Sequence, residues 1–169
     1  ARELLLYQSG IEVTKLTAEA GNKVLVTLKV PDDCPPGLHA LRLATESGIS
    51  NLRYLGVSPL PQAAEAEPNS DFAAPQVISM NTTVNGVVQN EDVDYYALDL
   101  KEGQVVTVEL EGLRLGTEFF DPTVAILDEN RFELVSSDDA PLLQQDCVCS
   151  LTAPKSGRYI VEVRESSFG

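Results

Sequence analysis

Apolar and polar residues alternate with a period of two along much of this chain, and this pattern restricts the fold more than any other feature. Between residues 23 and 30, for example, Val24, Val26, Leu28 and Val30 occupy every second position. A β-strand sends successive side chains to opposite faces, so such runs predict strands. No apolar stripe with helical spacing persists long enough to predict a helix. The sequence therefore predicts an all-β fold.

Turn-forming residues interrupt the alternation at short intervals, which is typical of a β-sandwich. The segment 31–37 holds three prolines and a glycine and ends the first run, because neither a helix nor a central strand could continue through it. Further strands are expected at 38–45, 51–57, 76–80, 84–88, 94–100, 104–110, 123–127, 132–136, 147–153 and 158–164.

A change in composition divides the chain. The segment 58–69 has three prolines and no β-branched residue, which is typical of a linker. We therefore predict two β-sandwich units, 1–58 and 75–169, joined by an acidic linker at 59–74. The two units do not resemble repeats of each other.

The net charge of the chain limits the classes of partner that it can bind. With 26 acidic and 12 basic residues the formal net charge is −14. Such a surface repels nucleic-acid backbones and anionic lipids and favours divalent cations, although acidity could equally serve solubility. No apolar run approaches the ~20 residues that a membrane helix needs, so no membrane insertion is expected.

The sequence offers little for catalysis. Its single histidine, His39, lies in an expected strand opposite Leu38 and is interpreted as a surface residue. There is no Gly-x-Ser-x-Gly turn and no phosphate-binding loop. Acidic pairs suited to glycoside hydrolysis are always available in so acidic a chain and carry little weight. We predict that the chain is not an enzyme.

The cysteines do not predict a disulfide framework. Cys147 and Cys149 lie two positions apart in an expected strand, so they share a face and are predicted to be buried apolar residues rather than a bridge. Whether Cys34 pairs with either of them stays open.

One acidic pattern predicts a metal site. Glu65, Glu67 and Asn69 alternate at a spacing of two. Asp92 and Asp94 repeat that spacing, and Glu91 directly precedes them. An extended backbone would send each set to one side, and calcium binds six to eight hard oxygen ligands of these types. The alternative is two solvated acidic turns. A second acidic set, Asp121, Asp128, Asp138 and Asp139, is interpreted first as turn and loop chemistry.

From Glu65 onward the chain resembles the bacterial pre-peptidase C-terminal domain family. The likeness rests on the segments 65–69, 85–88, 92–98, 101–104, 121–128 and 156–163. The resemblance implies a jelly-roll-like β-sandwich of the kind appended to secreted bacterial enzymes. The family includes the collagen-binding domains of clostridial collagenases, in which an acidic linker and an early loop hold calcium.

Carried over by position, the resemblance implies that Glu65, Glu67, Asn69, Asp92 and Asp94 bind Ca²⁺, with a backbone carbonyl near Gly86 and Val87 as a further ligand. One position departs from the pattern, because Ser70 stands where the collagenase domains have an acid. Fewer charges imply weaker binding, or one ion in place of two. Collagen binding is not implied, since it depends on a surface aromatic patch and no such patch can be placed on this sequence.

Residues 1–58 resemble the later strands of an immunoglobulin-like (TIG-like) domain, as in surface proteins of planctomycete-type bacteria. The likeness rests on the segments 1–7, 34–42 and 47–51. The opening strands of this domain, and the last strand of the pre-peptidase C-terminal family at the other end, are expected to be missing. Because the chain also opens with Ala-Arg-Glu-Leu, we expect a piece of a longer polypeptide. An open sheet edge would then be covered by the rest of that polypeptide or by neighbouring surface protein chains.

These features predict a non-catalytic accessory or structural module of a larger exported bacterial protein, at a secreted, periplasmic or cell-surface location, with calcium stabilising the junction of linker and sandwich. The alternative is a ligand-binding module for a carbohydrate or a protein fibre. That alternative predicts a row of exposed aromatic residues on one sandwich face. Tyr95 and Tyr96 are adjacent, so one of them is expected to point outward, and Phe119 with Phe120 offers a second candidate.

Overall fold

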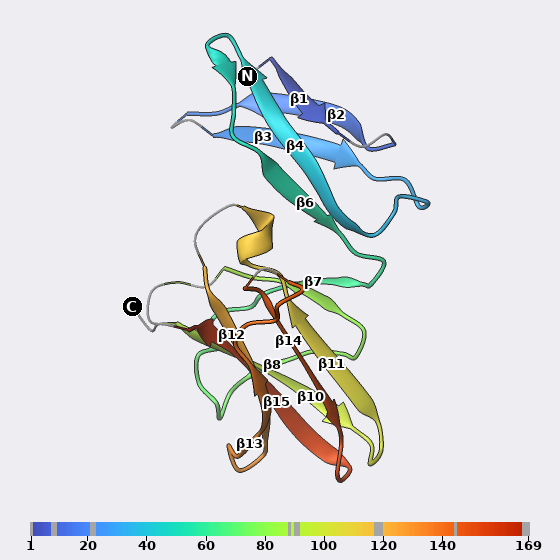
Figure 1. The fold of residues 1–169 in the computed structure, drawn as a ribbon, viewed down its shortest axis with the longest axis vertical. Coiled ribbons are helices and arrows are strands. Elements are labelled where there is room, and N and C mark those ends of the chain that lie inside the picture. The colour runs from blue at the N-terminus through green and yellow to red at the C-terminus, as the bar shows by residue number, and fades with distance from the viewer. Residues whose placement is uncertain are drawn as a thin grey trace. The chain divides into compact units, whose positions relative to one another are not determined.

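The computed structural model describes residues 2–7, 10–20, 23–87, 89, 92–116, 120–143 and 145–166. The described residues divide into two compact units (Figure 1): the first contains those up to Pro59 together with Leu115 and Gly116, and the second contains the others from Leu60 onward. Nearly all regular structure in both is β-strand, and the all-β prediction with sandwich units is confirmed. The described residues contain no helix with the length and apolarity needed to cross a membrane.

The first unit contains two antiparallel sheets. Its strands are β1 (Glu3–Leu6), β2 (Glu12–Ala18), β3 (Val24–Lys29), β4 (Gly37–Thr45), β5 (Gly48–Ile49) and β6 (Arg53–Val57). Strand β4 pairs with β1, β5 and β6, and β2 pairs with β3. The sequence did not predict β2, because a register shift between Val13 and Lys15 interrupts its alternation.

His39 is buried, so its interpretation as a surface residue is wrong. It lies in β4 opposite Leu55 of β6 and is 2% exposed. Alternation places it on the same face of β4 as Leu41, which is partly buried. The ring nitrogen Nε2 lies 2.7 Å from the carbonyl oxygen of Pro35, so the proline turn supplies the polar partner that a buried histidine needs.

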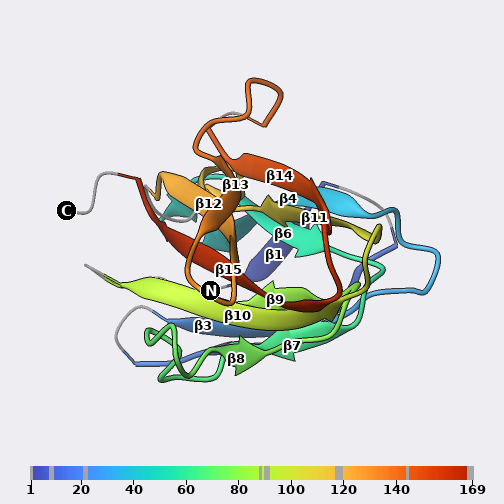
Figure 2. The ribbon, with the colours of Figure 1, turned by 90° about the horizontal axis from the view of Figure 1, so that it is seen from below.

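The second unit is built on a five-stranded sheet with the order β13-β12-β15-β10-β8, to which the pair β11-β14 and the pair β7-β9 are added. Its elements are β7 (Gln62–Ala64), β8 (Gln76–Val77), β9 (Thr83–Asn85), β10 (Val93–Leu100), β11 (Val105–Leu110), a 3-10 turn η1 (Leu113–Leu115), β12 (Pro122–Asp128), β13 (Glu133–Ser137), β14 (Cys147–Thr152) and β15 (Gly157–Glu165). Figure 2 shows β11 beside β14, in a layer separate from β10 and β15.

Both faces of the five-stranded sheet are covered. On one face Tyr96, Leu98, Val124 and Ile126 pack with residues of β11 and β14 in the main core. On the other face a smaller core contains Tyr95, Ala97, Ala125, Leu127 and Ile160, against which Phe72 packs.

The expectation that either Tyr95 or Tyr96 points outward is therefore wrong. They do face opposite sides of β10, as the alternation requires, but Tyr95 is 3% and Tyr96 7% exposed. The loop that carries Phe72 covers the second face, and the Phe72 and Tyr95 rings meet edge to face at 5.7 Å.

The segment predicted as a linker, 59–74, supplies strand β7 and the loop of Phe72 to the second unit. Cys147 and Cys149 are buried in the main core, as predicted, and all three cysteines are free.

Candidate functional site

The segment that carries Glu65, Glu67 and Asn69 is attached to the second unit along its length. Strand β7 pairs in parallel with β9, and the Glu65 N–H continues this pairing by donating to the Asn85 carbonyl at 3.0 Å. The side chain of Gln76 bridges the residues on either side of Glu65, because its Nε2 donates to the Ala64 carbonyl and its Oε1 accepts from the Ala66 N–H. These bonds hold residues 64–66 against the second unit and thereby position Glu65.

One backbone hydrogen bond brings this segment to the start of β10. The N–H of Tyr95 donates to the carbonyl of Asn69 at 3.0 Å. Asn69 thereby lies beside Asp94 and Tyr96, the residues that flank Tyr95 in the chain. The two acidic motifs, separated in the sequence, meet here.

Glu67, Asp92 and Asp94 form a cluster of three carboxylates, with one oxygen of each within 4.8 Å of the others. Two oxygens that bind the same calcium ion lie at most about 5 Å apart, since each Ca–O distance is about 2.3–2.6 Å. Glu67 is exposed, Asp92 is partly buried and Asp94 is buried, so the cluster runs from the surface inward. The geometry and the hard oxygen donors fit a calcium ion.

Asn69 adds an amide to this cluster from a fully buried position, with 0% exposure. In the orientation that gives both ends of the amide suitable partners, its nitrogen donates to Glu67 Oε2 at 2.9 Å and to Asp94 Oδ1 at 3.1 Å.

Glu65 contacts the opposite end of that amide and is itself held by two donors. The Tyr96 hydroxyl donates to its Oε1 at 2.6 Å, and the Val87 N–H donates to its Oε2 at 2.8 Å. Gly86 permits this approach, because a Cβ there would stand 2.8 Å from Glu65 Oε1. Val87, near which a carbonyl ligand was expected, thus contributes an N–H to the site.

Two residues that the sequence did not assign to the site hold Asp92 in place. The Ser70 hydroxyl donates to Asp92 Oδ1 at 3.0 Å, and the Gln89 N–H donates to Oδ2 at 3.4 Å. Ser70 stands at the position where the resemblance expected an acid, so this chain has a hydrogen-bond donor to Asp92 in place of a further charge. Glu91 lies outside the described residues.

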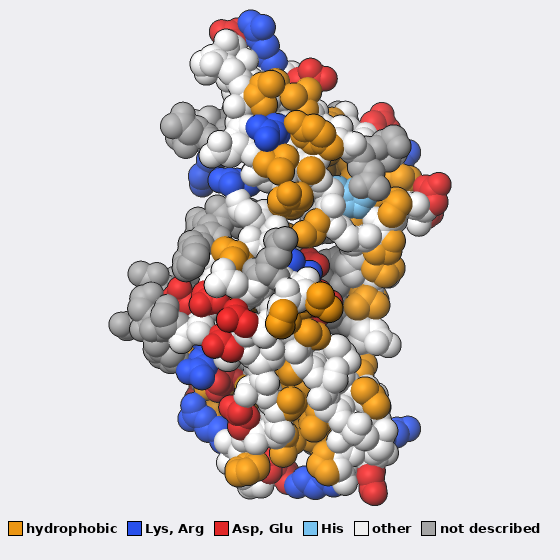
Figure 3. All heavy atoms as spheres, in the orientation of Figure 1, with side chains coloured by type: hydrophobic (Ala, Val, Ile, Leu, Met, Phe, Trp, Pro, Cys, Tyr) orange, Lys and Arg blue, Asp and Glu red, His pale blue; other side chains and the backbone are white. Residues whose placement is uncertain are grey.

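The cluster concentrates negative charge. Burial, and then the charges of Glu65, Asp92 and Glu67, raise the pKa of Asp94 to about 7. Near neutral pH a proton and a cation would therefore compete for this buried carboxylate. Acidic side chains also gather along one side of the second unit in Figure 3.

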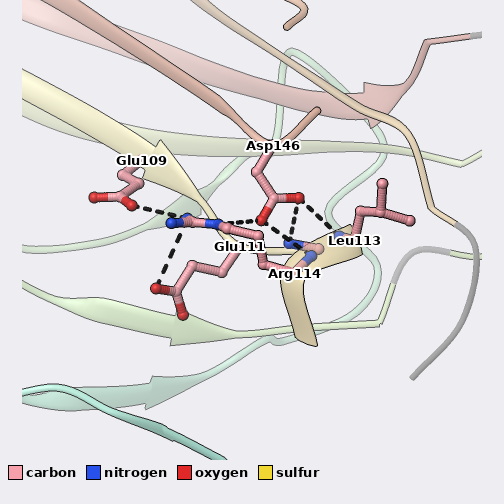
Figure 4. A network of polar contacts seen from close by, with 6 residues as sticks. Glu109, Glu111, Leu113, Arg114 and Asp146 are labelled. Atoms are coloured by element: carbon pink, nitrogen blue, oxygen red, sulfur yellow. Dashed lines mark hydrogen bonds and ion pairs between the residues drawn. The ribbon is translucent and has the colours of Figure 1, made fainter. Parts of the chain in front are cut away.

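A second polar network, centred on buried Asp146, is fully engaged and does not resemble a binding site (Figure 4). Asp146 accepts the N–H groups of Gly112 at 3.1 Å and Leu113 at 2.7 Å, and it pairs with the Arg114 Nε at 2.6 Å. Arg114 also pairs with Glu109 at 2.8 Å. This network fastens the turn η1 to the start of β14.

The second acidic set, which includes Asp121 and Asp128, does not form a cluster like that of Glu67, Asp92 and Asp94 in the described residues. Asp128 accepts the N–H groups of Asn130 and Phe132, which confirms its interpretation as a turn residue. Burial, and then the charges of Asp139 and Asp138, raise the pKa of Asp121. Among the described residues, however, only the Glu67 cluster brings three carboxylates close enough to share an ion.

Fold and site together define a β-sandwich module that carries a cluster of three carboxylates. Residues 92–165 match the family model of the bacterial pre-peptidase C-terminal domain. The match covers β10 to β15 and begins at Asp92 of the cluster, so this part of the chain is similar to a non-catalytic accessory domain of bacterial extracellular proteins. A search of the curated proteins finds no match.

Proposed function

We propose that the chain is a non-catalytic accessory module of a larger exported bacterial protein, and that its second unit binds one calcium ion through Glu67, Asn69, Asp92 and Asp94. The observation that supports this most strongly is the convergence of three carboxylates from two segments, beside the buried side chain of Asn69. Bidentate carboxylates and water would complete the six to eight ligands.

The consequence of binding is mechanical. Glu67 and Asn69 belong to the segment that follows β7. Asp94 lies in β10, and Asp92 directly precedes that strand. An ion held by both groups ties the segment to the sandwich and stabilises the folded state by mass action, by about 2.7 kcal/mol at 100 times the dissociation constant. It also relieves the repulsion among the carboxylates.

The first unit is proposed to be an immunoglobulin-like domain, supported by its two antiparallel sheets. Its buried apolar set is small, since Ile11 is the one buried hydrophobic residue among its described residues. A longer polypeptide or neighbouring surface chains are the proposed partners of its remaining apolar side chains.

The alternative function, binding a carbohydrate or protein fibre, has less support. It requires a row of exposed aromatic side chains, and both Tyr95 and Tyr96 are buried. In the described part of the second unit Phe132, at 69% exposure, is the one large aromatic residue that is well exposed. Phe119 lies outside the described residues.

Calorimetric titration with calcium, together with thermal unfolding in calcium and in chelator, tests the proposal. We expect a single binding event and a higher melting temperature in calcium, both lost in the double variant Glu67→Ala with Asp92→Ala. The matched control is Asp32→Ala with Asp33→Ala, which removes the same charge from an exposed turn of the first unit. Identical melts of the unaltered protein in both buffers would exclude the calcium assignment.

A further inference from the structure

Asn85 and Gly86 form the one Asn-Gly pair in the sequence. Asn85 ends the short strand β9, and both residues are exposed. An asparagine before a glycine is prone to lose its side-chain amide, because the backbone nitrogen of the next residue can attack the side-chain carbonyl carbon. Glycine favours the attack, since it has no side chain to hinder it and its backbone turns easily. The reaction needs only water and a base from the solvent.

The backbone nitrogen that would attack is not held by a hydrogen bond. No described residue accepts a bond from the Gly86 N–H, so none has to break before this nitrogen loses its proton. Within the described residues the Asn85 side chain is held by one exposed bond, from its Nδ2 to Gln62 Oε1 at 2.8 Å. The Asn85 carbonyl accepts the Glu65 N–H at 3.0 Å, and this bond opens when the end of the short strand frays.

We propose that Asn85 is a self-modification site: it converts to aspartate and isoaspartate, and the conversion detaches Glu65 from the backbone of Gly86 and Val87. This inference goes beyond the proposed function and does not depend on calcium. It assigns a covalent change to the strand that holds the segment of Glu65 in place.

The conversion takes two steps. The Gly86 nitrogen gives its proton to a solvent base and bonds to Cγ of Asn85, while the bond from Cγ to Nδ2 breaks and Nδ2 leaves as ammonia with that proton. The product is a five-membered cyclic imide. Water then adds to one of the two imide carbonyl carbons and opens the ring. Opening on one side gives aspartate, and opening on the other gives isoaspartate, whose main chain is longer by one methylene.

Both products disturb the contacts that hold Glu65. A carboxylate at position 85 has no N–H group for Gln62 Oε1, so the side-chain bond between β7 and β9 is lost. In isoaspartate the added methylene also displaces the residues that follow. The Glu65 carboxylate leaves little room for such a shift, since a Cβ on Gly86 would already stand 2.8 Å from its Oε1. Its Oε2 accepts the Val87 N–H at 2.8 Å, and this bond is lost when Val87 moves.

Peptide mapping by mass spectrometry tests the conversion in the folded protein, kept at pH 8 in water labelled with heavy oxygen. We expect the label to enter at position 85, in a mixture of aspartate and isoaspartate, before it enters at three other exposed asparagines. Each of those three precedes a residue with a side chain that hinders the attack, so they are controls within the same sample: Asn51, Asn81 and Asn130. Conversion of Asn85 only after unfolding in urea, or no faster than at the controls, would overturn the proposal.

Hydrogen exchange tests the detachment of Glu65. In converted protein we expect the amides of Glu65 and Val87 to exchange faster than in fresh protein, and the amide of Val161 in the central strand β15 to keep its rate. The variant Asn85→Gln is the matched control, because a glutamine would have to close a six-membered ring and reacts far more slowly. Its exchange rates should not change over the same period. Unchanged exchange at Glu65 and Val87 in fully converted protein would overturn the proposal.

Discussion

The carboxylate of Glu65 packs against the bare backbone of Gly86, with Oε1 2.8 Å from the place that a Cβ on Gly86 would occupy. A real Cβ does not approach an oxygen so closely, so the contact exists only because residue 86 has no side chain. It allows Glu65 to reach the Val87 N–H and the Tyr96 hydroxyl at the same time.

Gly86→Ala is therefore expected to lower the free energy of unfolding by about 1–3 kcal/mol, the usual cost of inserting a methyl group into a tight contact. Urea denaturation measures this. The control is the same substitution in a Glu65→Ala background, where the clash is gone and the cost should largely vanish. An undiminished cost in that background would mean that Glu65 is not the group displaced.

Asp94→Asn is expected to have opposite effects in chelator and in calcium. At pH 8 in chelator the substitution removes a buried charge whose pKa the surroundings raise to about 7. The free energy of unfolding should then rise by at least about 1 kcal/mol, the worth of about one pKa unit. In calcium the variant should lose the stabilisation that the unaltered protein gains.

The matched control is Asp99→Asn, an exposed position on the same strand β10. That variant should change neither the stability in chelator nor the response to calcium by a comparable amount. A loss of stability of Asp94→Asn in chelator would contradict the electrostatic account of this carboxyl.

Much of the second unit could be predicted from the sequence, because its strands alternate regularly and end in turns. Three predicted strands fall within observed ones: 94–100 within β10, 123–127 within β12 and 158–164 within β15. Strand β7 was not predicted, since the prolines at 59 and 61 resemble a linker and its parallel pairing with β9 is a long-range contact. Such a contact leaves no local pattern.

The spacing of the acidic residues predicted which of them lie near one another. It could not predict the contacts that each side chain makes. Alternation placed Glu65 with Glu67 and Asn69, whereas the structure engages Glu65 with Tyr96 and Val87. The burial of Tyr95 likewise depends on the loop of Phe72, which covers a sheet face that the sequence pattern alone leaves open.

Asp146→Ala should be among the most destabilising substitutions in the second unit. It would leave Arg114, whose side chain is 15% exposed, without its closest ion partner, and would leave the N–H groups of Gly112 and Leu113 without an acceptor. Breaking a buried pair from one side costs about 3–5 kcal/mol. Chemical denaturation measures the loss.

Glu129→Gln provides the comparison, since the pair Lys155–Glu129 is exposed on both sides. Exposed pairs contribute about 0–1 kcal/mol, so this variant should unfold at nearly the denaturant concentration of the unaltered protein. Similar losses for the two substitutions would show that burial does not set the worth of the Asp146 network.

The three thiols should divide into two classes of reactivity. Burial raises the pKa of Cys147 to about 12 and that of Cys149 to about 11, so almost no reactive thiolate is present at pH 8. Cys34 is only partly buried, in the proline turn of the first unit. Labelling the folded protein with a thiol reagent at pH 8 should modify Cys34 alone, and labelling in urea should modify all three. Rapid labelling of Cys147 in the folded protein would mean that the main core opens far more often than its packing implies, because both the raised pKa and the exclusion of reagent depend on that packing.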